Sequence, residues 1–482
     1  MLINRIRILY IKKIHSQLFT NSFWGILSNI FQNILFSIFF IVIARKYSTT
    51  DFANYILANT LYGFMLAFSS LGLGQWFIRE LMNSKDKQYL INKFFKIQMS
   101  SGLLFYIINI ILAYVLYKNE LIRNLSFLIG INVIFDNVIY VIKFINIAEF
   151  EQKKTFLILT IEALLKFIAA CFLFITTVPI IYLASLLIVL RFITLNLFIK
   201  IGSSNILNLK TIIFAKVDLS EIKHIILSNW MFIVIGSSSV IYWRVGNILV
   251  SKLLTLKDVS NYEISFKFFS IAEILPIIIS TSIFPMLVKI YGSIDSEKPN
   301  HNLYISSFIS YALYGLLAYT FIYSFSDSII PFLFGIKYLT TSYYCKEMFL
   351  TILIFPTALL QANLLIALKL EKTDMWLNLI SLTFNIFICF IGLLYFKSLS
   401  VVNYAIFISF IIFHICQDYI LIKREIINLY HAIYFYLSIF ILVFIYYYFS
   451  LFVLPILLFI IFWTIIISFF LLYLFKFRIN NE

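Results

Sequence analysis

Residues 180–199 read IIYLASLLIVLRFITLNLFI, an apolar run interrupted near its centre by Arg191. About 20 apolar residues are enough for one helix to cross the roughly 30 Å of hydrocarbon in a bilayer. The stretch predicts a membrane-spanning helix, because a helix satisfies its own backbone hydrogen bonds one segment at a time. A charge at the centre of such a helix is costly, so we expect Arg191 to face protein, water or a ligand.

Similar apolar stretches fill most of the remaining chain. We therefore predict an all-α integral membrane protein of about 14 transmembrane helices, with no large loop between them. The predicted spans lie near residues 21–43, 52–77, 97–117, 125–147, 156–177, 180–199, 226–250, 260–285, 302–325, 344–368, 375–396, 399–421, 432–449 and 451–475.

The composition agrees with a chain that lies mostly in a membrane. Hydrophobic residues make up 62% of the 482 residues and charged residues 12%, and the mean hydropathy is +0.99. Soluble domains carry about twice this share of charged residues. The four cysteines form no CxxC pair, which argues against a disulfide framework and a metal knuckle. We predict no catalytic residues, no metal and no cofactor.

The distribution of basic residues predicts the orientation. With fourteen spans, most of the 37 Lys and Arg residues fall in the loops and tails on one side, so both termini are expected to be cytoplasmic. The net charge of +15 then reflects orientation and attraction to anionic lipid headgroups. No soluble basic face is predicted, so nucleic acid is not an expected partner.

The chain divides into two similar halves. A short motif of Asp, Asn and Tyr recurs after the first span of each half, as Asp51, Asn54 and Tyr55 and again as Asp258, Asn261 and Tyr262. Six spans per half give both halves the same orientation, which is typical of a parallel repeat around a central cavity. The predicted parts are an N-terminal amphipathic segment (1–20), an N-lobe (21–199), a cytoplasmic linker (200–225), a C-lobe (226–421) and two last spans with the tail (422–482).

Charged residues at span depth are candidates for function. We expect Arg191 and Arg244 to bind substrate, with Lys267 and Lys166 as further cations, because arginine holds phosphate oxygens bidentately. Three carboxylates remain open between ion coupling and neutralising the arginines: Asp136, Glu162 and Glu273.

One pair of these charges, and two prolines near others of them, also have simpler structural interpretations. Glu162 and Lys166 lie four residues apart, so the pair can neutralise itself on one helix face. Pro276 and Pro285 interrupt the predicted span 260–285 and kink it, either as a gate or as a static bend.

Several motifs, in their order along the chain, resemble the polysaccharide flippase family of the O-antigen (Wzx) type. This family belongs to the multidrug/oligosaccharidyl-lipid/polysaccharide exporter superfamily. The similar stretches are Ala44-Arg45, the group from Asp51 to Tyr55, Gly72 to Gly74 with Arg79, Tyr242 to Arg244, and Ile330 to Tyr338. The chain departs from the pattern at Ala53, at Ser260 and at Gly246, which weakens any ion-coupling role transferred to that last position.

The resemblance implies a flippase that moves undecaprenyl-diphosphate-linked oligosaccharide, an O-antigen or capsule repeat unit, across a bacterial inner membrane by alternating access. It also implies contacts with a polymerase and other polysaccharide-assembly proteins. A cation-coupled multidrug exporter of the same superfamily is the first alternative. A membrane glycosyltransferase or polymerase is the second, although the short first outer loop and the scattered histidines argue against it.

Overall fold

The computed structural model describes Trp24, Leu27 and residues 30–176, 178–202, 219–291 and 302–479. Helices account for most of these residues, and none of them lies in a β-strand. The prediction of an all-α protein is confirmed. The predicted amphipathic segment 1–20 and most of the predicted linker 200–225 lie outside the described residues.

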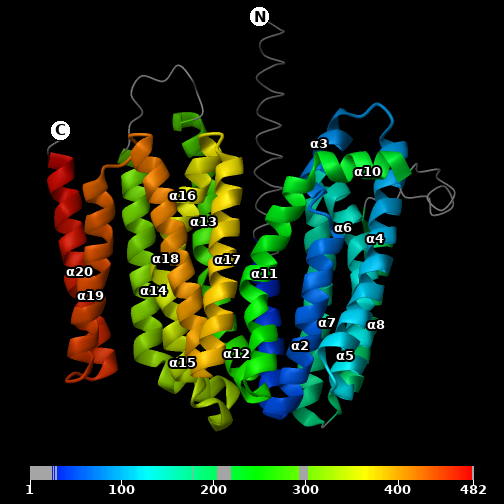
Figure 1. Ribbon diagram of the computed structural model, residues 1–482, viewed down its shortest axis with the longest axis horizontal. Helices are drawn as coiled ribbons and strands as arrows, with labels where there is room; N and C mark the ends of the chain where they lie inside the picture. Colours follow the sequence, from blue (N-terminus) through cyan, green and yellow to red (C-terminus); the bar gives the residue numbers. More distant parts are fainter. Residues whose placement is uncertain are drawn as a thin grey trace, which may run out of the picture. The chain divides into compact units, whose positions relative to one another are not determined.

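The helices group into two compact units, Met1–Ser260 and Asn261–Glu482, with the boundary inside α12. The helices of the first unit are visible in Figure 1 from blue to green. They comprise residues 30–46, α2 (Thr49–Ser69), α3 (Gly74–Asn83), α4 (Lys87–Leu116), α5 (Glu120–Gly130), α6 (Asn132–Ala148), α7 (Gln152–Ile175), α8 (Ile180–Ile201), α10 (Leu219–Ser228), α11 (Trp230–Leu253) and the start of α12 (Leu256–Ala272).

The second unit is built from the remaining helices. After the end of α12 they are α13 (Ile274–Tyr291), α14 (Asn302–Phe334), η2 (Ile336–Tyr338), α15 (Thr341–Met348), η3 (Phe349–Leu353), α16 (Phe355–Ala367), α17 (Glu371–Phe396), α18 (Ser400–Lys423), α19 (Leu429–Ser450) and α20 (Pro455–Ile479).

Each of the fourteen predicted spans contains a described helix, and ten helical segments are long and apolar enough to cross a membrane. Large apolar side chains lie exposed along them, for example Ile168 at 61% and Phe387 at 61%. Such exposure is stable in hydrocarbon, where an apolar surface has no water to exclude. The chain is a multi-pass membrane protein.

The predicted span 52–77 is shorter than expected. Helix α2 ends at Ser69, because Leu71 (φ 53°) and Gly72 (φ 57°) adopt the left-handed conformation that stops a helix. The chain restarts as α3 at Gly74, where a Cβ atom would collide with the ring of Phe144. The absence of a side chain at Gly74 therefore allows α3 and α6 to lie in close contact, and the Gly74 N–H donates to the Tyr140 hydroxyl at 3.1 Å.

The repeated Asp motif caps the second helix of each half in the same way. The Asp51 N–H donates to Ser48 Oγ at 3.0 Å, and Ser48 Oγ donates to Asp51 Oδ2 at 2.7 Å. Thr255 and Asp258 form the equivalent pair, with Thr255 Oγ1 donating to Asp258 Oδ2 at 2.6 Å. Both pairs satisfy backbone N–H groups at a helix start. The repeat therefore extends from sequence to local structure.

The repeated asparagine also has an equivalent partner in each half. Asn54 Oδ1 accepts from Asn119, the residue that caps α5, at 3.4 Å. Asn261 Oδ1 accepts from Thr341, the first residue of α15, at 2.8 Å. In both cases the second helix of the half is joined to the start of its fourth predicted span.

The predicted kink near Pro276 is present as a break between α12 and α13 at Glu273. Pro276 has no N–H, so the carbonyl of Ala272 loses its helical donor. The hydroxyl of Tyr314 on α14 donates to that carbonyl at 2.5 Å, and the hydroxyl of Tyr311 donates to the carbonyl of Pro276 at 3.1 Å. The bend is therefore held by tyrosines of a neighbouring helix.

The other prolines lie at different positions in their helices. Pro285 lies inside α13, which continues through it to Tyr291. Pro356 lies in the first turn of α16 and Pro455 opens α20. At a helix start the missing N–H costs nothing, because the first N–H groups of a helix have no partner in it.

We predict that Tyr314→Phe lowers the free energy of unfolding by about 0.5–1.5 kcal/mol, the usual net value of one hydrogen bond. In a Pro276→Ala background this loss should shrink, because the alanine restores a backbone N–H that can bond to the carbonyl of Ala272. Tyr311→Phe is the matched control, since its acceptor persists in both backgrounds. Unfolding measured in detergent as a double-mutant cycle tests this, and equal losses for Tyr314→Phe in both backgrounds would contradict it.

Candidate functional site

Four of the predicted charged residues meet inside the first unit. Arg191 lies in the middle of α8, which packs against α6 and α7. Its Nε donates to Asp136 Oδ1 of α6 at 2.5 Å, and Nη2 contacts the same oxygen. Its Nη1 donates to Glu162 Oε2 of α7 at 2.5 Å. One guanidinium thus joins three helices through two carboxylates.

Lys166 extends this network along α7. Its Nζ lies 2.7 Å from Glu162 Oε1, which confirms the predicted pair on one helix face. The same Nζ lies 4.5 Å from the ring centroid of Phe36, in the helix of residues 30–46. Glu162 therefore has two cationic partners, and both Asp136 and Glu162 pair with Arg191.

Two further residues of the cluster were not predicted. The hydroxyl of Tyr62 on α2 donates to Asp136 Oδ2, the oxygen that Arg191 leaves free. Lys143 lies half-buried on α6, within electrostatic range of Arg191, Asp136 and Glu162. We call Tyr62, Asp136, Lys143, Glu162, Lys166 and Arg191 the membrane charge cluster. Its three cations and two carboxylates leave it one positive charge in excess.

The cluster exposes its cations and buries its anions. The side chains of Arg191 and Lys166 are 20% and 21% exposed, whereas those of Asp136 and Glu162 are 4% and 1% exposed. The side chains of the two cations are therefore more accessible than those of the two carboxylates. The net positive charge of the cluster favours an anionic ligand over a cationic one.

The other predicted site residues lie on other helices. Arg244 is half-buried on α11, a helix that packs against α2 within the first unit. Lys267 is half-buried on α12, in the second unit. Glu273 is the residue at the break between α12 and α13, and it too is partly exposed. Their predicted roles in substrate binding and ion coupling remain predictions.

A model of the family described as "Polysaccharide biosynthesis protein" matches residues 18–291, more than half of the chain. The chain belongs to the polysaccharide biosynthesis protein family. The match contains the whole membrane charge cluster, so these charges lie within the part of the chain that carries the family signal. No curated protein matches the chain significantly.

Solved structures of transporters have the same fold as this chain. The inward closed conformation of the lipid II flippase MurJ aligns with a TM-score of 0.67 and 16% identity, over 93% of this chain and all of that one. An inward-facing MATE multidrug resistance transporter of the MOP superfamily aligns with a TM-score of 0.66 and 10% identity, over 82% and 96%. These likenesses place the chain in the fold of flippases and transporters.

The ion pairs of the cluster make a prediction about stability. Arg191→Gln alone should lower the free energy of unfolding by about 3–5 kcal/mol, because two buried carboxylates lose a shared counter-ion. Adding Asp136→Asn should recover most of this loss, because it removes the carboxylate that has lost its arginine while Glu162 keeps its pair with Lys166. Denaturation of the purified variants in detergent measures both effects. A double variant no more stable than Arg191→Gln would show that the unpaired carboxylate is not the cause.

Proposed function

We propose that the protein is a flippase for undecaprenyl-diphosphate-linked oligosaccharide, such as an O-antigen or capsule repeat unit, in a bacterial inner membrane with both termini cytoplasmic. The observation that carries this proposal is the membrane charge cluster, which turns its cations outward and its carboxylates inward. Membership of the polysaccharide biosynthesis family and the fold shared with a lipid II flippase support the substrate class.

In this proposal Arg191 and Lys166 contact the diphosphate as it passes the hydrocarbon layer, and Arg244 and Lys267 are further substrate contacts. The sugars and the diphosphate are too polar to cross hydrocarbon alone, since a single charge at its centre costs about 2.5–3.5 kcal/mol or more. Two lobes of like orientation would open a polar cavity to one side at a time, while the polyprenyl tail stays in the lipid.

A drug exporter of the same superfamily is less well supported, although MATE transporters share the fold. An exporter of organic cations needs carboxylates that its substrate can reach. Asp136 and Glu162 are almost fully buried and are bonded to Arg191 and Lys166. The reachable side of this cluster repels cations. Export of cationic dyes by cells that express the protein would favour this alternative.

Two substitutions on α7 test the proposal with a matched control. Lys166→Gln removes an accessible cation while Arg191 still neutralises Glu162, so the fold should persist. If Lys166 holds the diphosphate, flipping should fall about 10-fold or more, since a hydrogen bond to a charged group contributes roughly 1.5–3 kcal/mol. Lys154→Gln makes the same change in an exposed pair with Glu151 and should leave flipping unchanged.

The readout is the fraction of undecaprenyl-diphosphate-linked oligosaccharide in proteoliposomes that becomes accessible to an added glycosidase. Equal flipping by Lys166→Gln, Lys154→Gln and the parent protein, at equal protein content, would remove Lys166 from the substrate path. Failure of the parent protein to flip this lipid above protein-free vesicles would refute the proposed function itself.

A further inference from the structure

A second buried polar cluster lies in the second unit and consists of residues that have not been described so far. Asp418 on α18 is bonded on both carboxylate oxygens. Gln361 of α16 donates to Oδ1 at 2.6 Å, and Tyr436 of α19 donates to Oδ2 at 3.0 Å. His414, one turn before Asp418 on α18, lies with Nδ1 3.1 Å from Oδ2 and 2.6 Å from the Tyr436 hydroxyl.

The two clusters differ in the chemistry of their counter-ions. Arg191 and Lys166 carry permanent positive charges at physiological pH. The ion-pair partner of Asp418 in the described part of the chain is His414, which is positive only when its ring holds two protons. The Asp418 carboxylate is therefore paired with a group that can gain and lose a proton. The carboxylates of the membrane charge cluster are paired with Arg191 and Lys166, whose charges are permanent.

The other titratable groups around this pair do not replace that charge. Tyr304 faces it from α14, Tyr436 from α19 and Cys416 from the same helix. From α17, Asp374 meets the adjacent Gln417 and adds a carboxylate rather than a cation. Among these described neighbours, charge balance for Asp418 therefore depends on one proton.

His414 offers a defined position for that proton. Its side chain is completely buried, and the ring stacks on Phe435 with centroids 5.1 Å apart. Nδ1 faces Asp418 and Tyr436, whereas Nε2 has no hydrogen-bond partner among the described residues. Nδ1 is therefore the ring nitrogen that can share a proton with Asp418 or Tyr436.

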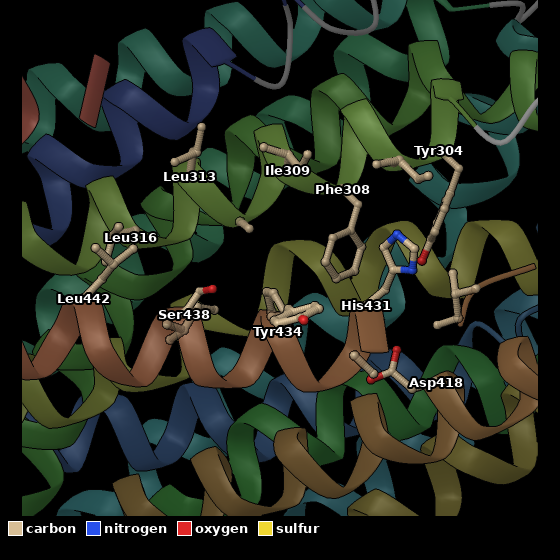
Figure 2. Close-up of a pocket in the computed structure, with 16 residues that line it drawn as sticks. Tyr304, Phe308, Ile309, Leu313, Leu316, Asp418, His431, Tyr434, Ser438 and Leu442 are labelled. Atoms are coloured by element: carbon tan, nitrogen blue, oxygen red, sulfur yellow. The ribbon is translucent and has the colours of Figure 1, made fainter. Parts of the chain in front are cut away.

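A cavity lies beside the cluster, at Asp418. It has a volume of about 330 Å³ and lies among α14, α18 and α19, with Asp418 in its wall. Figure 2 shows Tyr304, His431 and Asp418 at one end and the apolar Leu316 and Leu442 at the other. The polar end lies where α18 ends and α19 begins, on the side that the basic loops predict to be cytoplasmic.

We propose that His414 and Asp418 form a reversible proton-binding site that is reached from the cytoplasmic side through this cavity, at Asp418. A proton that enters at the Asp418 carboxylate and is shared with Nδ1 of His414 gives an imidazolium–carboxylate pair that is neutral overall. Loss of the proton leaves Asp418 as an uncompensated charge at membrane depth, which favours a different packing of α18 against α19 at Tyr436. As a coupling site this inference rests on the proposed transport function, but proton binding itself does not.

Nitrogen NMR of the full-length protein labelled at histidine, in lipid nanodiscs, tests the site directly. The His414 signal, assigned by its loss in His414→Gln, should change from the neutral to the imidazolium pattern between about pH 8 and pH 5, the range in which histidine changes charge. In Asp418→Asn the response of this signal to pH should differ from that of the parent protein, because the charge next to the ring is gone.

His224 is the matched control, since it is an exposed histidine on α10, in the first unit. Its titration should be the same in the parent protein and in Asp418→Asn. A His414 ring that keeps one protonation state across this range, or that titrates identically in Asp418→Asn, would overturn the proposal.

Flipping in proteoliposomes under an imposed pH gradient separates this proposal from the proposed function. In the parent protein the flipping rate should depend on the pH gradient. In His414→Gln this dependence should be lost, while flipping that does not depend on the gradient continues. A parent protein that flips at a rate independent of the gradient would overturn coupling but keep the flippase. A protein in which His414 titrates but no lipid-linked sugar moves would keep the proton site and refute the flippase.

Discussion

The need to neutralise charge inside hydrocarbon determines how the first unit is built around Arg191. An unpaired charge at this depth costs several kcal/mol, so its partners must come from neighbouring helices. Asp136 and Glu162 supply them from α6 and α7, and Tyr62 saturates the remaining oxygen of Asp136 from α2. The same bonds that make the charge tolerable therefore fix the relative positions of four helices.

The same constraint applies to backbone groups in the second unit. A carbonyl that loses its helical donor to a proline cannot accept a hydrogen bond from water at membrane depth, so another part of the protein must provide the donor. Tyr314 and Tyr311 do so at the break next to Pro276, from one face of α14. A chain with 31 tyrosines can use the phenol in this way because its ring stays in an apolar layer while its hydroxyl donates.

The helices and the charges that mattered were predictable from the sequence, but their partners across helices were not. Arg191 and the carboxylates stand out because charges are rare in apolar runs, and the Glu162–Lys166 pair follows from helical spacing alone. Lys143 lies two turns from Asp136 on α6, so helical periodicity alone would have found it. Tyr62 carries no such signal among so many tyrosines, because only tertiary packing selects it.

The second cluster shows where the sequence signal was present but passed over. His414 and Asp418 lie four residues apart on one apolar span, a spacing that places them on one helix face. Weighing the histidines only as possible catalytic residues of a glycosyltransferase or polymerase missed this spacing. Gln361 and Tyr436 come from other helices, so the packing of the unit was needed to complete the cluster.

The carboxylates beside Arg191 also bear on how a diphosphate could be released after it crosses. A bare arginine in a low-dielectric cavity would hold such an anion strongly, because Coulomb attraction grows as water is excluded. Transport requires binding that is favourable enough to admit the anion and weak enough to let it leave. In the proposed function, Asp136 and Glu162 are already bonded, so the anion would gain only the accessible parts of Arg191 and Lys166. The buried acids would then lower the affinity for the diphosphate, through the same ion pairs that hold the helices together.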